Sequence, residues 1–133
     1  MTTQAQEAVE RIKARRKKPE EALQKAIVQY LRTVMTKDYR VIAVPNAARR
    51  TRGGRAGNAV PGLSKGFPDL LIVEAGGGAF AIDVKAPKGV MSPEQNEWKQ
   101  WFFLHSFPHC VARSVDDVKV ALTHWKIETR EAA

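Results

Sequence analysis

Two short stretches decide the fold of this chain: Gly66-Phe67-Pro68-Asp69 and, thirteen residues further on, Ile82-Asp83-Val84-Lys85. Between them lie two apolar runs joined by the glycines at 76–78, a pattern that predicts a β-hairpin. Asp83 and Lys85 are two positions apart on the second strand, so their side chains leave the same face. Acids at the start of one strand and the end of the next can hold a divalent cation beside a lysine. This combination is typical of phosphodiester hydrolysis.

The spacing Asp/Glu-x-Lys is weak support by itself, because a chain of this length contains roughly one such triplet by chance. Three triplets occur here: Asp83-Val84-Lys85, Glu97-Trp98-Lys99 and Asp117-Val118-Lys119. Only the first lies in a strand-like run bounded by turn signals. The other two lie in segments of helical periodicity, where the charges are expected on solvated faces. The context therefore selects the first triplet.

The composition indicates a single globular domain. The chain has 133 residues, of which 44% are hydrophobic, and no apolar run approaches the roughly 18 residues that a membrane span needs. The polar N-terminus lacks the apolar core of a signal peptide. The single Cys110 cannot form an internal disulfide, which agrees with a reducing compartment. We therefore expect a cytoplasmic protein without a membrane partner.

Positive charge is in excess and clustered. The chain has 22 basic and 14 acidic residues, a formal net charge of +8. Clustered basic residues are typical of proteins that bind a phosphate backbone, although either cluster alone is also compatible with a solvated surface. We expect DNA-binding roles for two groups: Arg15, Arg16, Lys17 and Lys18 near the N-terminus, and Arg49, Arg50, Arg52, Arg55 and Lys65 before the hairpin.

Turn and cap signals divide the chain into helices and strands. Pro19 is expected to end an N-terminal basic helix or arm and to begin a new helix, and Ser92 with Gln95 forms the capping box of a later helix. The long loop 46–66 is rich in Gly and Arg and could become ordered only when nucleic acid binds. The predicted elements are helices over 4–18 and 20–36, strands at 40–44, 69–75 and 79–85, a helix over 92–105, a strand at 109–113 and a helix over 115–125. This order predicts an α/β fold with a mixed sheet and helices on its faces.

With these motifs in order, the chain resembles the PD-(D/E)XK nuclease superfamily and, within it, the virus-type replication-repair nuclease (VRR-NUC) family. The resemblance spans about residues 20 to 125, and Asp83 stands where the family more often has Glu. The matching pieces are Glu20-Glu21-Ala22-Leu23-Gln24, Val44-Pro45-Asn46, Gly66-Phe67-Pro68-Asp69, Ile82-Asp83-Val84-Lys85 and Ser92-Pro93-Glu94-Gln95.

The resemblance implies a restriction-endonuclease-like core, that is, a small mixed β-sheet flanked by helices. It also implies a nuclease of the phage or bacterial kind that acts in DNA repair on branched DNA such as Holliday junctions, as a homodimer. We therefore expect a basic N-terminal helix or arm at 1–18, a single VRR-NUC-like nuclease domain at 19–128 and a C-terminal tail at 129–133.

Asp69 and Asp83 are the expected metal ligands, because hard carboxylate oxygens suit Mg²⁺, for which Mn²⁺ can substitute. The alternatives are a turn residue for Asp69 and an exposed charge paired with Lys85 for Asp83. The resemblance adds the backbone carbonyl of Val84 as a ligand. Lys85 is expected to orient or deprotonate the attacking water, or to hold the scissile phosphate.

A helix carboxylate is expected to supply a further metal and catalytic contact. At about 100° per residue, Glu20 falls near the centre of the apolar stripe and Glu21 far to its side, so Glu20 is preferred. Both acids could instead serve only the helix dipole. Gln95 is a candidate catalytic contact or simply a helix cap. No nucleotide cofactor is expected, because the glycine-rich stretches lack the Lys-Ser/Thr of a phosphate loop.

The remaining aromatic and histidine residues are expected to have structural rather than catalytic roles. Trp98, Trp101, Phe102 and Trp125 recur at helical spacing and are expected in a core or dimer contact rather than as base-stacking platforms. A metal pair of His105 and His109 is set aside, because Pro108 interrupts the helix between them. Two alternatives to the junction-specific enzyme stay open: a general duplex-nicking nuclease, and a non-catalytic DNA-binding or recombination-accessory protein on the same fold.

Overall fold

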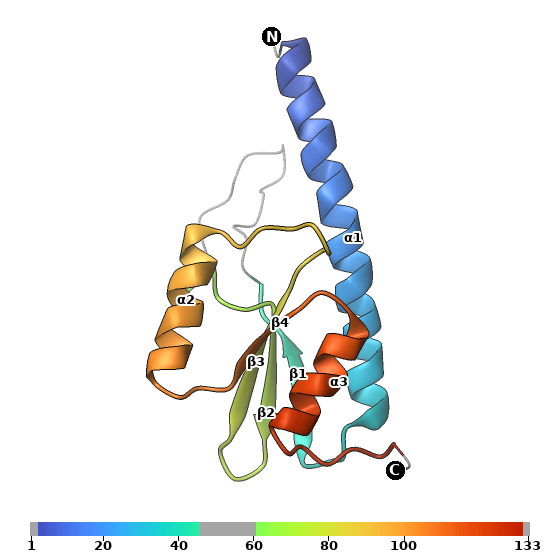
Figure 1. The fold of residues 1–133 in the computed structure, drawn as a ribbon, viewed down its shortest axis with the longest axis vertical. Coiled ribbons are helices and arrows are strands. Elements are labelled where there is room, and N and C mark those ends of the chain that lie inside the picture. The colour runs from blue at the N-terminus through green and yellow to red at the C-terminus, as the bar shows by residue number, and fades with distance from the viewer. Residues whose placement is uncertain (1–2, 46–60, 132–133) are drawn as a thin grey trace.

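The computed structural model describes residues 3–45 and 61–131, without the side chains of residues 10 and 12–18. Its centre is a four-stranded sheet with the strand order β1-β2-β3-β4, and helices lie around it (Figure 1). In chain order the elements are α1 (Gln4–Val34), β1 (Tyr39–Ala43), β2 (Leu70–Glu74), β3 (Ala79–Val84), α2 (Pro93–Leu104), β4 (His109–Ala112) and α3 (Val115–His124).

The sheet is mixed, as the sequence predicts. β1 pairs with β2, and β2 with β3, in antiparallel orientation, while β3 and β4 are parallel. The β2–β3 hairpin closes through the Glu74 N–H, which donates to the Gly78 carbonyl at 2.8 Å. Gly76 and Gly77 have φ values of +96° and +113°, a region that favours glycine. The three glycines therefore form the turn that the sequence predicts.

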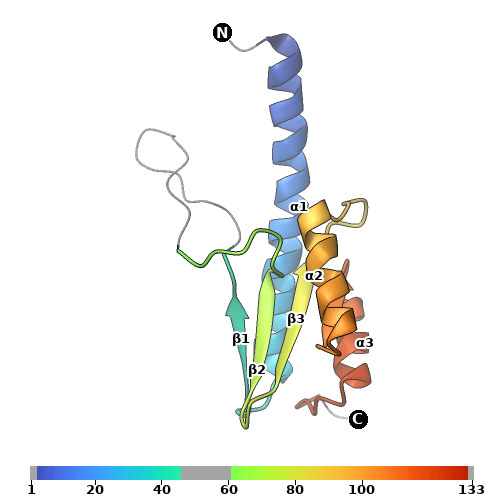
Figure 2. The ribbon, with the colours of Figure 1, turned by 90° about the vertical axis from the view of Figure 1, so that its left-hand side faces the viewer.

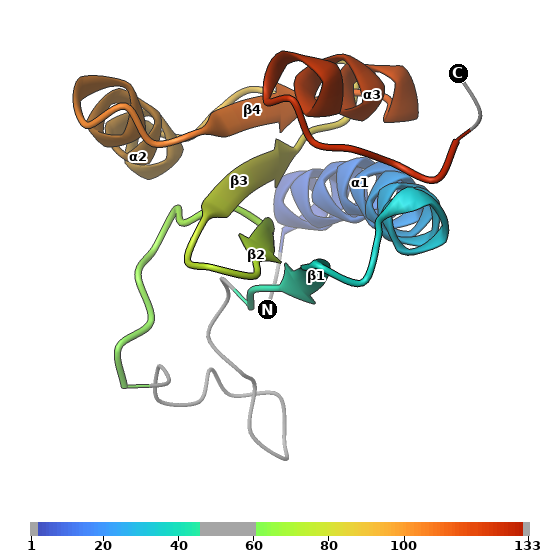
Figure 3. The ribbon, with the colours of Figure 1, turned by 90° about the horizontal axis from the view of Figure 1, so that it is seen from below.

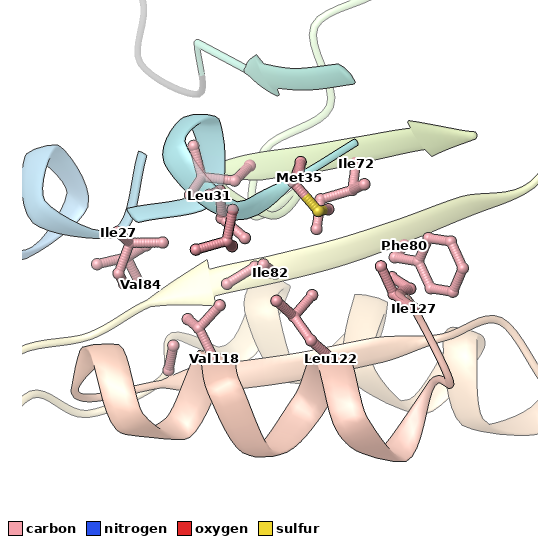
Figure 4. Packing of buried hydrophobic residues seen from close by; sticks show 13 residues of the cluster. Ile27, Leu31, Met35, Ile72, Phe80, Ile82, Val84, Val118, Leu122 and Ile127 are labelled. Atoms are coloured by element: carbon pink, nitrogen blue, oxygen red, sulfur yellow. The ribbon is translucent and has the colours of Figure 1, made fainter. Parts of the chain in front are cut away.

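Helices cover both faces of the sheet. Figure 3 shows α1 and α3 on one side and α2 on the other. On the first side, Ile27 and Leu31 of α1 and Leu122 of α3 meet the alternating side chains of β3, among them Ile82 and Val84 (Figure 4). Each such buried aliphatic side chain contributes about 1.5–3 kcal/mol. This core fixes the position of β3, whose C-terminal end carries Asp83.

The predicted break at Pro19 is wrong, because α1 is continuous from Gln4 to Val34. An interior proline removes one helical hydrogen bond and costs about 3 kcal/mol. The cost is offset at both ends: Thr3 caps the N-terminus in a capping box with Gln6, and the C-terminal half buries Ile27 and Leu31. Tertiary packing thus overrides the local signal. The N-terminal half of α1 projects beyond the sheet (Figures 1 and 2).

The described part of the predicted tail lies against the end of α1. Thr129 forms an isolated antiparallel bridge with Met35, and the Arg130 N–H donates to the Val34 carbonyl at 2.6 Å. The Tyr30 hydroxyl donates to a Glu131 carboxylate oxygen at 3.2 Å. None of the described helices combines the length and the apolarity needed to cross a lipid bilayer.

Candidate active site

Asp69 lies where the start of β2 meets the end of β3. It directly precedes Leu70, which pairs with Ile82 in the sheet register. Its Oδ2 accepts the Val84 N–H at 2.8 Å, and its backbone carbonyl accepts the Val44 N–H at 2.8 Å. Asp69 is therefore fixed from β3 on one side and from the segment after β1 on the other.

Asp83 is completely buried and shares a hydrogen bond with a histidine on the neighbouring strand. Its Oδ2 lies 2.7 Å from Nε2 of His109, whose side chain is also nearly buried. An ionised Asp83 can only accept, and it would then pair with the His109 tautomer that carries its hydrogen on Nε2. The other oxygen, Oδ1, has no hydrogen-bond partner among the residues that the structure describes. A buried carboxylate oxygen without a partner is costly, and a bound cation would satisfy it.

The acids around Asp69 influence one another electrostatically. Burial raises the pKa of Asp69, and the hydrogen bond from the Val84 N–H opposes this effect. The charges of Asp83 and Glu20 raise the pKa of Asp69 further, whereas the charge of Lys85 lowers it. Since like charges held together favour a positive counter-charge, the cluster suits a cation.

Lys85 and Glu20 form an ion pair at the edge of the cluster, with 3.8 Å between Lys85 Nζ and Glu20 Oε1. The Lys85 side chain is 11% exposed and that of Glu20 34%, whereas Glu21 is exposed on the outside of the helix. The structure thus brings Glu20 to the site from α1, on the side that the helical spacing indicates. A direct metal contact by Glu20 stays a prediction.

The loop after β3 covers this ion pair and is held by an arginine that the sequence analysis does not single out. Arg113, one residue after β4, donates from Nη1 to the carbonyls of Ala86 and Gly89, both at 2.8 Å. A Cβ added at Gly89 would lie 3.2 Å from Glu20 Oε1 and 3.4 Å from Lys85 Cδ. Arg113 therefore positions the loop against both members of the pair.

Gln95 has the capping role that the sequence offers as one of two alternatives. Its side-chain oxygen accepts the Ser92 N–H at 2.8 Å, and its own N–H donates to Ser92 Oγ at 3.1 Å. A catalytic contact by Gln95 stays a prediction. Lys65 pairs with Glu94 at 3.3 Å. The other expected DNA-binding residues lie outside the described residues or have no described side chain: Arg15, Arg16, Lys17, Lys18, Arg49, Arg50, Arg52 and Arg55.

The two histidines four residues apart lie on different elements. His105 caps α2 and packs on Trp101 with 4.5 Å between ring centroids, whereas His109 begins β4. Within residues 3–45 and 61–131, no three His, Cys, Asp or Glu side chains converge to form a metal-binding group. A cation beside Asp69 and Asp83 would thus take further ligands from the main chain, water or substrate. Mg²⁺ commonly binds through only one or two carboxylates in this way.

The fold and this site define a class of protein. A small mixed sheet flanked by helices, with Asp69, Asp83 and Lys85 at adjoining strand ends, is the core of a PD-(D/E)XK-type nuclease. The VRR-NUC domain matches residues 3–116, so the chain belongs to the VRR-NUC family. Membership implies a nuclease of the virus-type replication-repair family, with DNA as its substrate.

The match begins at residue 3 and therefore includes the basic N-terminal segment, which the resemblance alone leaves outside. This agrees with the continuous α1. No curated protein and no solved structure shows a significant match to the chain.

The His109–Asp83 hydrogen bond leads to a prediction for His109. If Asp83 binds a metal, removing its hydrogen-bond partner should cost about 10- to 100-fold in activity or metal affinity, and we expect this loss for His109→Ala. His109→Gln should retain most of the activity, because its amide N–H can donate to Asp83 from a similar position. Initial cleavage rates measured across a Mg²⁺ titration check this, with His124→Ala, at an exposed position of α3, as the control. If Gln and Ala impair cleavage equally, the hydrogen bond is not what matters.

Proposed function

We propose that this protein is a metal-dependent, structure-selective endodeoxyribonuclease that hydrolyses phosphodiester bonds in branched DNA, in the manner of a Holliday-junction resolvase. The observation that carries the proposal is the buried Oδ1 of Asp83, which has no hydrogen-bond partner within the described residues. It lies beside Asp69, whose pKa is raised by burial and by its acidic neighbours. Together with family membership, this arrangement favours a catalytic centre over a purely structural ion pair.

Asp69 and Asp83 would hold the metal, which is Mg²⁺ with Mn²⁺ as a substitute. The Val84 carbonyl is a further candidate. Glu20 is another, although it does not converge with Asp69 and Asp83 in this structure and would have to leave its ion pair with Lys85 to reach the ion. When bound, the ion supplies an activated water and stabilises the charge that develops on the phosphate. The Val84 N–H keeps Asp69 in place through its 2.8 Å hydrogen bond, and His109 does the same for Asp83.

Lys85 supplies a positive charge next to the carboxylates of the site. Its ammonium group orients the attacking water or holds the scissile phosphate. The ion pair with Glu20 keeps the side chain extended towards the site. Arg113 maintains the loop over this pair through its contacts with the carbonyls of Ala86 and Gly89.

Affinity for DNA comes from the excess of basic residues, which gives a net charge of +8. Contacts with backbone phosphates make binding salt-sensitive and largely independent of sequence. Selectivity then depends on DNA shape rather than on base edges. A homodimer would present two active sites to the two opposed strands of a junction, and an origin in a phage or a bacterium, with a cytoplasmic location, fits this role.

The test is cleavage in Mg²⁺ of a synthetic four-way junction, compared with linear duplex, flap and single-stranded DNA of the same sequence. We expect paired incisions in the junction that are absent when the metal is chelated. Equal cleavage of every substrate would favour the general duplex-nicking enzyme. Binding without cleavage in Mg²⁺ and Mn²⁺ would favour the non-catalytic accessory protein. The assembled set Asp69, Asp83 and Lys85 argues against that last alternative.

A further inference from the structure

A cavity of about 420 Å³ lies beside α2, next to the stretch that carries Asp69 to the site. It is lined by Ser64, Lys65, Glu97, Trp98 and Trp101. Two tryptophans, a lysine, a serine and a glutamate thus line one open space. None of the catalytic roles proposed above uses this cavity.

Trp101 packs on His105, with 4.5 Å between ring centroids, but lies at the margin of the packing of α2. Phe102 is 2% exposed and provides the buried contact of this helix. Trp98 is held edge-on by Phe67, with 4.9 Å between ring centroids and 87° between planes. Trp101 meets Trp98 at 5.8 Å and 70° and remains 48% exposed. The sequence predicts these aromatics in a core or dimer contact rather than as base-stacking platforms. Phe102 is in the core, whereas the half-exposed Trp101 has surface left for a ligand.

We propose that this cavity binds an unpaired nucleobase of the DNA substrate close to the cleaved bond, an inference that rests on the proposed function. Aromatic side chains stack on any exposed base, because every base has a π-face. The Glu97 carboxylate accepts hydrogen bonds from an amino group on a base edge. These are the contacts that a single base requires.

The polar residues that line the cavity can bind the phosphate group of the same nucleotide. The Lys65 side chain is 82% exposed, and its partner Glu94 is also solvent-accessible. An exposed ion pair of this kind is weak because water screens both charges, so the ammonium can exchange Glu94 for a phosphate oxygen. The Ser64 hydroxyl lines the same wall and can donate to a second oxygen.

The cavity also lies at a suitable distance from the metal site. Lys65 precedes Asp69 by four residues, a span of at most about 14 Å even when fully extended. Gly66 locks this segment against α2, because its Cα approaches Glu94 so closely that an added Cβ would lie 2.6 Å from the Glu94 carbonyl carbon. A base in the cavity is therefore attached to the strand within a few nucleotides of the reacting phosphate.

This placement gives a physical basis for structure selectivity. A base inside a duplex has both faces covered by its neighbours and cannot enter the cavity without unstacking, which is unfavourable. An unpaired base at a branch point, flap or single strand enters at little cost. The cavity thus discriminates by pairing state rather than by sequence.

The experiment compares Trp101→Ala with Trp101→Phe, both in the Asp83→Asn background and without metal, so that only binding is measured. The probe is a flap carrying 2-aminopurine at its first unpaired position, with a fully paired duplex of equal length as reference. We expect Trp101→Ala to weaken binding to the flap on the order of 10-fold and to abolish the quenching of 2-aminopurine. Trp101→Phe should retain both, and affinity for the duplex should change by less than about twofold.

Two results would overturn the inference. One is an equal loss of affinity for flap and duplex. The other is a change of oligomeric state in Trp101→Ala, seen by sedimentation, with unchanged quenching. That result would assign the surface to a second copy of this chain, together with the exposed Phe103 and Leu104 of the same helix. The assay measures binding and does not depend on cleavage. If the wild-type protein cleaves no DNA, the proposed function is contradicted, but the binding of the unpaired base can still be tested.

Discussion

Asp83→Asn is expected to abolish cleavage of branched DNA while leaving its binding intact. The substitution keeps the volume of the side chain and an oxygen that can accept the His109 N–H, but it removes the charge that would hold the metal in the proposed site. Metal-ion stabilisation of the transition state is worth several kcal/mol, and a loss of about 4 kcal/mol lowers the rate on the order of 10³-fold. Affinity resides mainly in the basic residues, so the dissociation constant for the junction should stay within about twofold.

The matched control is Asp117→Asn. It also removes a carboxylate charge, but from the second Asp-x-Lys triplet, Asp117-Val118-Lys119, which lies on α3. Asp117 accepts the Arg113 N–H at 2.8 Å, a contact that the amide oxygen of Asn preserves. Single-turnover cleavage and a gel-shift titration, run side by side, separate chemistry from binding. Substantial cleavage by Asp83→Asn would remove Asp83 from the site. Loss of binding together with cleavage would contradict the proposed division between metal ligands and DNA-binding residues.

Most of the fold follows from local signals in the sequence. The glycines at 76–78 predict the hairpin, and Ser92 with Gln95 predicts the start of α2; the structure confirms both. These signals act within a few residues and therefore need no knowledge of the tertiary structure. Pro19 is the exception. Its local cost is real, but the packing of Ile27 and Leu31 several turns away decides that α1 continues.

In the candidate site, too, local sequence signals identify some residues, whereas others depend on the tertiary structure. Asp69, Asp83 and Lys85 are found from sequence because the hairpin brings them together without help from other elements. His109 and Arg113 are not found, because β4 reaches the site only through its parallel register with β3, in which Asp83 faces Val111. A register between distant segments depends on the whole core. No local pattern marks either residue as part of the site.

The aromatic residues of α2 show a related limit of what helical periodicity can predict about burial. Trp98, Trp101 and Phe102 all fit a helical apolar stripe, and periodicity cannot distinguish the buried side of a wide stripe from its margin. The structure makes the distinction, with Phe102 buried and Trp101 half exposed. A large aromatic residue at the margin of a stripe, next to an expected catalytic loop, therefore merits attention as a ligand contact.

Gly66→Ala is expected to be the most destabilising single-methyl change in the described part of the chain. Gly66 has φ = +84°, and an added Cβ would lie 2.6 Å from Glu94 C and 2.8 Å from Gln95 N. Both are backbone atoms in the first turn of α2, so no side-chain rotation can relieve the clash. Overpacking and positive-φ strain together should lower the free energy of unfolding by about 2–4 kcal/mol. Cleavage should fall as well, because Asp69 follows three residues later.

Gly62→Ala separates the two causes, because Gly62 has nearly the same φ of +85° but, within the described residues, no atom within 4 Å of an added Cβ. It should show only the strain, about 1 kcal/mol. Urea unfolding followed by tryptophan fluorescence gives both values. The difference between the two variants measures how closely the segment before Asp69 is held against α2. Equal losses would mean that this contact is loose, and the position of Asp69 would then depend on its hydrogen bonds to Val44 and Val84 alone.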